Sequence, residues 1–228
     1  MLLPTFEYQT LFHFLTSKTQ ASHRPEIGFD QIESLQHPLR QDELPSIERA
    51  VEKRKKEFTA GRSLARLLLR KFNIASSIGK NDDRSPQWPA GIVGSISHTD
   101  HHCAVALGPS ANFRSIGLDI EIIGHVKTEL WAALFTETER NALAQTQDPD
   151  RRAMLATLFF SAKEAFYKYQ YPLTGKWVEF HAAQVKVLSR TTFQISHTVQ
   201  HPLLTSPLVG YFDQPTPSTL ASLLYTEI

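Results

Sequence analysis

The sequence contains only one cysteine, Cys103, among its 228 residues. A single cysteine excludes a disulfide within the chain and a zinc site built on several cysteines. No secretory signal is evident at the start, because Pro4 interrupts the first apolar residues and no basic residue precedes them. These features fit a reducing compartment, and we expect a cytoplasmic protein.

Long apolar runs are missing as well. No stretch approaches the roughly 18 apolar residues of a membrane-spanning helix, so we expect no membrane partner. Charge of one sign is not in excess either, since the formal net charge is +1. This balance argues against a nucleic-acid binder. An anionic ligand would therefore have to meet a local cluster of lysine and arginine side chains.

Apolar residues, in contrast, make up 41% of the chain, enough for a packed core and too many for a disordered chain. Their spacing predicts a helix from about 46 to 72, with Ser46 as N-cap. Two further helices are expected on either side of a break near Asp148, at 130–144 and 151–169. The expected strands are 92–97, 103–107, 115–123, 178–188, 191–199 and 208–212, and residues 1–45 receive no element.

Each half of this pattern has a long helix followed by strands. The pattern predicts an α+β protein with two similar subdomains, 1–110 and 111–228. In each subdomain we expect the long helix to pack on an antiparallel sheet.

Two acidic residues stand at alternate positions of the expected strand that begins near residue 115. Side chains alternate faces along a strand, so Asp119 and Glu121 project from one face and Leu118 and Ile120 from the other. Neighbouring carboxylates repel each other unless solvent or a cation separates them, and Mg²⁺ prefers such oxygen ligands. The alternative is a half-exposed strand with two solvated acids.

A second acid and a lysine lie on the expected helix 151–169. Glu164 projects nearly opposite the apolar stripe of that helix, and Lys168 follows one turn later. Phe160 and Tyr167 lie on the same side, which favours a partly covered site. The alternative is a surface salt bridge between residues i and i+4.

A third stretch is basic. Lys55, Arg62 and Arg66 fall on one face of the expected helix 46–72, where guanidinium groups at this spacing can grip phosphate. Gly61 within this helix costs about 1 kcal/mol relative to alanine, so it calls for a reason such as close packing or room for a ligand. The alternative is a solvated basic face.

The expected strand 92–97 ends in a hydroxyl and an imidazole, Ser97 and His98. His98 at that place suits a phosphate donor, a base or a turn residue. His101 and His102 follow, but one loop rarely supplies the geometry of a three-histidine metal site, and no second group of ligands supports it.

Taken together and in this order, these stretches resemble the 4′-phosphopantetheinyl transferase superfamily, in particular the branch of the surfactin-type enzymes and the enterobactin-synthase D component. The motif G-x-D-x-E appears at 117–121, and W/F-x-x-K-E-A/S-x-x-K appears at 160–168. Ala60-Gly61-Arg62, the turn at 84–89 and Ser95-Ile96-Ser97-His98 precede them. The resemblance covers about residues 50–175. The family often has tryptophan where this chain has Phe160, a difference that affects packing and not chemistry.

The resemblance implies two subdomains related by a pseudo-twofold axis, with coenzyme A bound in the cleft between them. It also implies a set of site residues. Mg²⁺, or alternatively Mn²⁺, would be held by Asp119, Glu121 and Glu164. Coenzyme A would be contacted by Arg62, Arg84, Ser97, His98, Lys163 and Lys168, with Arg62 at the adenosine end. Lys55 and Arg66 match no position of the family pattern.

The implied reaction is attack by a serine hydroxyl of an acyl or peptidyl carrier protein on the pyrophosphate of coenzyme A, which releases 3′,5′-adenosine bisphosphate. Glu164, Lys168 and Asp119 are the implied catalytic residues, with Glu164 taking the serine proton. A monomer is implied, because this chain carries both halves that shorter members of the superfamily assemble across subunits.

Three other functions fit parts of the sequence. The first is a coenzyme A-binding protein without transfer activity, although all three acids are present. The second is an unrelated Mg²⁺-dependent phosphohydrolase, which would leave the Ala-Gly-Arg helix and the Ser-His strand end without a role. The third, nucleic-acid binding through the basic helix, is opposed by the near-neutral net charge.

Overall fold

The computed structural model describes residues 23–228, and every structural statement below refers to them. The chain is an α+β protein with two main antiparallel sheets, as the sequence predicted. The helices are α2 (Glu52–Leu69), α3 (Trp131–Leu134), α4 (Glu137–Gln145) and α5 (Pro149–Thr174). The strands are β1 (Glu26–Gln31), β2 (Gly79–Lys80), β3 (Pro86–Gln87), β4 (Ile92–His98), β5 (His102–Pro109), β6 (Phe113–Ile122), β7 (Ala183–Val187), β8 (Thr192–His197), β9 (Leu208–Thr216) and β10 (Thr219–Glu227).

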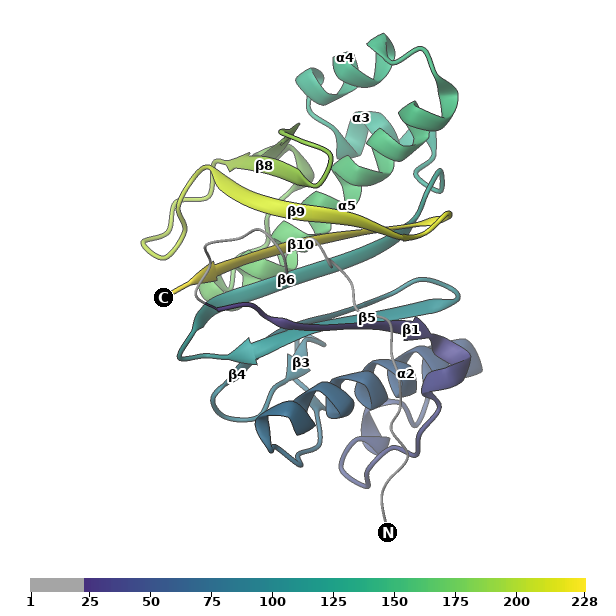
Figure 1. Cartoon of the computed structure of the whole chain (residues 1–228), viewed down its shortest axis with the longest axis vertical. Coiled ribbons are helices and arrows are strands. Elements are labelled where there is room, and N and C mark those ends of the chain that lie inside the picture. The colour runs from purple at the N-terminus through teal and green to yellow at the C-terminus, as the bar shows by residue number, and fades with distance from the viewer. Residues whose placement is uncertain (1–22) are drawn as a thin grey trace.

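The two main sheets differ in size. The smaller has the order β1-β5-β4, and the larger has the order β6-β10-β9-β8-β7. All their neighbouring strands are antiparallel. A separate hairpin of β2 and β3 follows α2, and short 3₁₀ helices include η1 (Ile32–Leu35), η2 (Leu44–Ser46), η3 (Arg70–Phe72), η4 (Thr128–Leu130) and η5 (Phe180–Ala182). In Figure 1, α2 lies at one end of the molecule and α4 at the other, with the two sheets between them.

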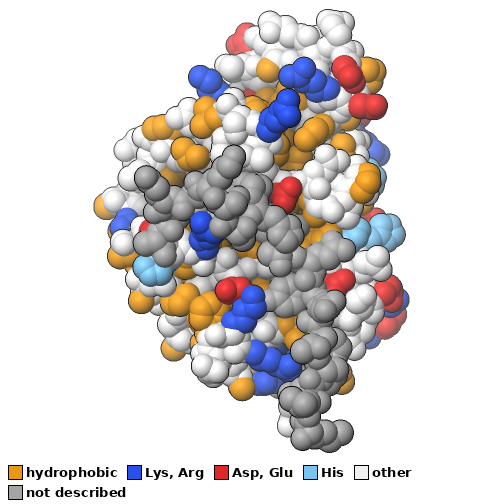
Figure 2. Space-filling view, viewed as in Figure 1, with side chains coloured by type: hydrophobic (Ala, Val, Ile, Leu, Met, Phe, Trp, Pro, Cys, Tyr) orange, Lys and Arg blue, Asp and Glu red, His pale blue; other side chains and the backbone are white. Residues whose placement is uncertain are grey.

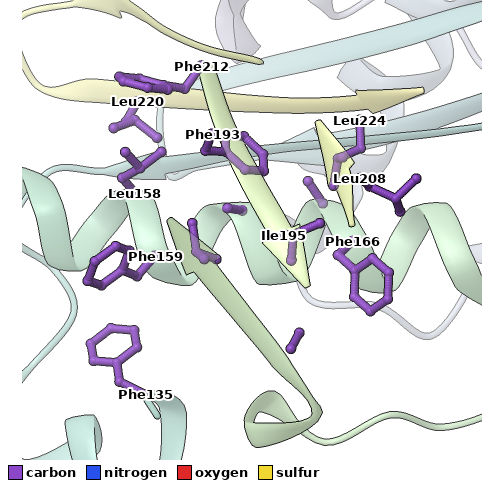
Figure 3. Packing of buried hydrophobic residues seen from close by; sticks show 14 of the residues in the cluster. Phe135, Leu158, Phe159, Phe166, Phe193, Ile195, Leu208, Phe212, Leu220 and Leu224 are labelled. Carbon is purple, nitrogen blue, oxygen red and sulfur yellow. The ribbon is translucent and has the colours of Figure 1, made fainter. Parts of the chain in front are cut away.

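Three apolar clusters hold these layers together. One packs α2 on the smaller sheet, a second fills the space between the two sheets, and a third packs α5 on the larger sheet. Figure 3 shows the third cluster, where Leu158, Phe159 and Phe166 of α5 meet Phe193, Ile195 and Leu224 of the strands. The apolar stripe predicted for this helix is therefore its buried side.

The side chains of β6 alternate between the core between the two sheets and the face covered by α5. Ile116, Leu118 and Ile120 enter the core between the sheets, so Gly117 and Asp119 point the other way. Gly117 lies directly against α5: a Cβ placed there would stand 2.0 Å from the carbonyl oxygen of Ala165. The glycine of the G-x-D-x-E motif thus allows α5 to approach the face of β6 that carries the acids.

The two sheets also meet edge to edge, because β4 lies beside β6 through side-chain bonds. The Ser95 hydroxyl donates to the Leu118 carbonyl oxygen at 3.2 Å. The Ser97 hydroxyl oxygen accepts from the Ile120 N–H at 3.3 Å. Two serine hydroxyls therefore do here what backbone pairs do inside a sheet, and they bring the end of β4 next to the acidic strand.

Several predicted boundaries need correction. Ser46 is not an N-cap: it ends η2, and α2 begins six residues later after Val51, which makes no side-chain cap. The helix expected at 130–144 is two helices, because Thr136 opens α4 with a capping box completed by Glu139. The break near residue 148 is confirmed, and Asp148 is the N-cap of α5, since its carboxylate accepts from the N–H groups of Asp150 and Arg151.

Two long strands were missed. β1 lies in the region that received no element, and β10 follows the last predicted strand. β10 is a nearly continuous buried run, and such runs lack the alternation that the prediction relied on. β1 is an edge strand of six residues in which only Ile27, Gly28 and Phe29 are buried, so its apolar signal is short. The part of the 1–45 region up to residue 22 lies outside the described residues.

The surface carries no dominant charge on the described part of the face in Figure 2, where basic, acidic and apolar side chains are interspersed. This agrees with the near-neutral net charge. No helix within residues 23–228 has the length and apolar character needed to cross a membrane.

The close contact at Gly117 gives a first prediction. Gly117→Ala places a methyl group against backbone atoms of α5, so we expect the free energy of unfolding to fall by roughly 3 kcal/mol or more in urea denaturation. Gly61→Ala is the matched control. Its new methyl group meets only side chains, with Ile96 nearest at 3.0 Å, and alanine suits a helix better by about 1 kcal/mol. Equal losses for the two variants would contradict the argument.

Candidate active site

Asp119 lies at the centre of the candidate site and is 2% exposed. Its Oδ1 accepts from the Ser97 hydroxyl at 2.9 Å and from Lys168 Nζ at 2.7 Å, and Lys168 also donates to Ser97 at 3.0 Å. Its Oδ2 is buried and accepts no hydrogen bond from the described chain. β4, β6 and α5 each supply one of these three residues, which the sequence predicted together.

Glu121 and Glu164 complete the acidic group. Burial raises the pKa of Glu121 to about 8, and repulsion from Asp119 and Glu164 adds to the effect while Lys168 opposes it. The pKa of Glu164 is also raised, first by burial and then by Asp119. The three predicted carboxylates therefore repel one another electrostatically, and the positive charge of Lys168 alone does not neutralise all three.

This donor set fits a hard divalent cation. Buried carboxylates that repel each other, one with an oxygen that lacks a partner, are the oxygen ligands that Mg²⁺ prefers. The carboxylates are not gathered into a preformed metal cage, since no group of three or more His, Cys, Asp or Glu side chains in the described chain stands close enough to hold an ion. The same finding leaves His98, His101 and His102 without a metal site of their own.

His98 links the acids to a basic region on α2. Its Nε2 lies 2.8 Å from Arg54 Nη1. A guanidinium group has only donors, so Nε2 is the acceptor in this contact. Burial lowers the pKa of His98, with the neighbouring Glu57 opposing the shift, and Lys168 and Asp119 are near enough to act on it. Arg54 was not among the predicted site residues.

A cavity of about 680 Å³ opens beside this contact. Four basic residues line it: Arg49, Arg54, Lys80 and Arg84. Arg84 was predicted to contact coenzyme A, and the other three were missed. They come from α2, the segment before it and the β2–β3 hairpin, so sequence spacing alone does not bring them together. The cavity suits a ligand with several negative charges.

An apolar pocket with a volume of about 100 Å³ includes Glu164 in its lining. Its wall is the segment after α5, and its lining includes Tyr167, Trp177 and Phe180. Trp177 is 77% exposed and packs edge-on against the Tyr167 ring. The basic cavity therefore connects through Arg54 and His98 to the acidic group, and Glu164 belongs to both the acidic group and the apolar pocket.

Arg62 does not reach this site as the sequence predicted. It is 5% exposed, and its guanidinium donates to the carbonyl oxygens of Ile78 and Gly79 at 2.9 and 2.8 Å. Burial lowers the pKa of Arg62 to about 10, so it stays charged at neutral pH. Arg66 pairs with the buried carboxylate of Glu43, and Lys55 pairs with Glu52. The expected phosphate-gripping face is thus replaced by three separate intrachain contacts.

Lys163 was predicted to contact coenzyme A, but its ammonium group is fully used within the protein. Nζ donates to Glu139 Oε2 at 2.7 Å, to the Leu134 carbonyl oxygen at 2.8 Å and to the Phe180 carbonyl oxygen at 3.0 Å. Its side chain is 1% exposed. The predicted residue lies next to the site without a donor to offer to a ligand.

The fold and site define the class of this protein: an α+β protein whose buried acids and flanking basic cavity suit a metal-assisted reaction of a phosphorylated ligand. Two family models identify it further. Residues 42–108 match the 4′-phosphopantetheinyl transferase N-terminal domain, and residues 115–211 match the 4′-phosphopantetheinyl transferase superfamily.

Curated relatives agree. The chain is 35% identical to the 4′-phosphopantetheinyl transferase Npt of Nocardia iowensis, over 69% of this chain and 72% of the relative. It is 33% identical to PptT of Mycobacterium tuberculosis, over 63% of each protein. It is 39% identical to enterobactin synthase component D of Salmonella typhimurium, over 65% of this chain and 62% of the relative. The chain belongs to the 4′-phosphopantetheinyl transferase superfamily, and the resemblance drawn from its motifs is confirmed.

The buried position of Arg62 gives a second prediction. We expect Arg62→Met to lower the free energy of unfolding by about 2–4 kcal/mol, because two carbonyl oxygens lose a charged donor. Arg49→Met is the control: Arg49 is exposed on the basic cavity, and its loss should change stability by less than about 0.5 kcal/mol. Chemical denaturation of both variants measures this, and an Arg62 variant of unchanged stability would refute the structural role.

Proposed function

We propose that this protein transfers the 4′-phosphopantetheine group of coenzyme A to a serine of an acyl or peptidyl carrier protein. The observation that carries the proposal is the run of contacts from the basic cavity through Arg54 and His98 to the acidic group with Lys168, and from Glu164 into the apolar pocket. Coenzyme A has the same order of parts: a phosphorylated adenosine, a pyrophosphate and an uncharged arm. The names of the relatives, which are phosphopantetheinyl transferases and enterobactin synthase components, support the same reaction.

The basic cavity is the proposed site of the adenosine phosphates. Arg49, Arg54 and Lys80 join Arg84 there and replace Arg62 in the predicted role. The pyrophosphate then lies near His98 and Lys168, and the arm enters the pocket at Trp177. In this proposal, the path is the cleft that the family resemblance implies.

Asp119, Glu121 and Glu164 are the residues that would hold Mg²⁺, or Mn²⁺ in its place. The ion would supply positive charge to the pyrophosphate as charge develops on the leaving oxygen. The unpartnered Oδ2 of Asp119 and the raised pKa values of the two glutamates support this role.

Bond formation joins the serine oxygen to the β-phosphorus, and the bond from that phosphorus to the leaving phosphate oxygen breaks. Glu164 accepts the serine proton, directly or through a water molecule, and the raised pKa brings this carboxylate nearer to the range that suits a general base. Lys168, held on Asp119 and Ser97, provides positive charge beside the transferred group. The product 3′,5′-adenosine bisphosphate keeps its contacts in the basic cavity.

The proposal also includes the division into subdomains, the oligomeric state and the location of the protein. The two family matches support a division of the chain near residue 110 into subdomains of similar design. Each main sheet carries one long helix, which supports a pseudo-twofold relation between the halves. We propose that the protein is a monomer, because one chain contributes every residue of the proposed site. We also propose that it acts in the cytoplasm, as expected from its single cysteine.

The direct test is intact-mass analysis of an apo carrier domain incubated with the protein, coenzyme A and Mg²⁺. We expect the carrier to gain one phosphopantetheine unit. Glu164→Gln should slow the reaction by about 10²-fold or more, since it removes the base but keeps the shape of the side chain. Glu179→Gln, at the rim of the apolar pocket, is the matched acidic control and should retain most of the activity.

Two outcomes separate the proposal from its alternatives. Coenzyme A binding without transfer to either a peptidyl or an acyl carrier would favour a binding protein. Absence of both transfer and coenzyme A binding would remove the proposed function altogether.

The carboxylates predict a pH-dependent effect of metal on stability. In the metal-free protein the pKa of Glu121 is raised from 4.5 to about 8, so the folded state holds this proton more tightly than the unfolded state. Its stabilising contribution is complete below the unfolded value and is lost as the pH rises through the folded value. A divalent cation offsets that loss by binding the ionised form.

We therefore expect MgCl₂ to raise Tm by about 3 °C more at about pH 8.5 than at about pH 6. Glu121→Gln should remove most of this difference, and thermal unfolding of both proteins at the two pH values measures it. A Tm increase that is the same at both pH values in the wild-type protein would contradict the assignment.

A further inference from the structure

The buried ion pair of Lys163 and Glu139 connects several elements of the larger subdomain through hydrogen bonds. Glu139 Oε1 accepts from the Val185 N–H at 2.7 Å, and Oε2 accepts from the Thr136 N–H at 2.8 Å and from Lys163. Lys163 in turn donates to the carbonyl oxygens of Leu134 and Phe180. Every charged atom of the pair is used, so the pair fixes α3, α4, α5, η5 and β7 relative to one another.

One of these contacts holds the wall of the apolar pocket. The wall runs from Trp177 to Phe180, after α5 has ended and before β7 begins. It belongs to no sheet, so regular strand pairing does not fix it. Side chains of α5 hold it at two places: Gln170 Nε2 donates to the Lys176 carbonyl oxygen at 3.0 Å, and Lys163 donates to the Phe180 carbonyl oxygen.

The aromatic residue of the helix motif adds a third contact to the same wall. The Phe160 ring stacks on the Phe180 ring at a centroid distance of 5.7 Å. Phe160 and Lys163 thus clamp one residue, the first through its ring and the second through its carbonyl oxygen. Glu164, the proposed base, follows Lys163 directly in α5 and lines the same pocket. The same turn of α5 therefore carries the proposed base and the lysine that holds the wall.

We propose that Lys163, supported by Glu139, is a positioning residue that sets the wall of the apolar pocket and thereby the binding of the uncharged arm of coenzyme A. This inference rests on the proposed function. Lys163 is among the residues that line the pocket, but its ammonium group is fully used within the protein, so we assign it no contact with substrate. It acts through Phe180, and Glu139 acts through Lys163.

The test compares two ligands that differ only in the arm. Coenzyme A carries it, whereas adenosine 3′-phosphate 5′-diphosphate keeps the adenosine phosphates and the pyrophosphate and lacks the arm. Dissociation constants of both ligands are measured by calorimetry with Mg²⁺ for the wild-type protein, Lys163→Met and Glu139→Gln. The ratio of the two constants reports the arm alone.

We expect the wild-type protein to prefer coenzyme A. In Lys163→Met and Glu139→Gln the affinity for coenzyme A should fall about tenfold, within the range for residues that orient a ligand contact, and the affinity for the armless ligand should change less than about twofold. Glu139 does not line the pocket, so an effect of Glu139→Gln on the ratio passes through the groups that it holds, which are Lys163 and the N–H groups of Val185 and Thr136. Glu139→Gln keeps the shape of the side chain and one acceptor oxygen, and it serves as the test if Lys163→Met fails to fold.

Arg66→Met is the matched control, because it breaks the other buried ion pair, with Glu43, in the layer of α2. A loss of stability is common to both pairs. We expect Arg66→Met to lower Tm without changing the preference for coenzyme A over the armless ligand. A purely structural role for Lys163 predicts the same result for Lys163→Met.

The outcomes separate this inference from the proposed function. If the wild-type protein binds neither ligand, the proposed function fails. If it binds both equally, or if Lys163→Met and Glu139→Gln keep the wild-type ratio, the positioning role is overturned and the proposed function stands.

Discussion

The close approach of α5 to β6 at Gly117 is the contact on which the rest of the site depends. Any side chain at this position would meet the backbone of α5, and the two elements would separate. Their contact brings Asp119 from the strand next to Glu164 and Lys168 from the helix. The same contact buries the acidic group, and burial is the main cause of the raised pKa values of Glu121 and Glu164. The contact of α5 with β6 at Gly117 therefore determines both the packing of these elements and the electrostatics of the acidic group.

Buried charges have two different uses in this protein. The Lys163–Glu139 and Arg66–Glu43 pairs make further hydrogen bonds within the protein, to backbone groups of α3, η5 and β7 and to the Ile78 N–H, and so hold separate segments together. Asp119, in contrast, keeps one carboxylate oxygen without a partner in the described chain, and Glu121 and Glu164 retain mutual repulsion. Unsatisfied charge is unfavourable in a protein interior, so its concentration at one place distinguishes a site that binds from a contact that stabilises.

The helix motif combines both uses within nine residues. Glu164 and Lys168 face the acidic group, whereas Phe160 and Lys163 face the segment that follows the helix. Phe160 lies between Lys163 and Glu164 around the helix, because residues three and four positions apart share a helix face, so the motif spans two adjoining surfaces. The helix motif therefore contains two proposed site residues, Glu164 and Lys168, and two residues that support the neighbouring segment, Phe160 and Lys163.

The sequence by itself determined the α+β class, most of the strands around residues 92–122, the central part of α5, predicted as 151–169, and the grouping of the central acids with Ser97 and Lys168. These follow from local rules: alternation places Asp119 and Glu121 on one face, and helical spacing places Glu164 and Lys168 on another. It did not determine which basic side chains serve the site. Arg62 and Lys163 match the pattern but end in buried contacts, whereas Arg49, Arg54 and Lys80 gather at the cavity from separate segments. Only tertiary structure decides this, because a long cationic side chain bonds to whichever acceptors packing brings within reach, and those acceptors lie far away in the sequence.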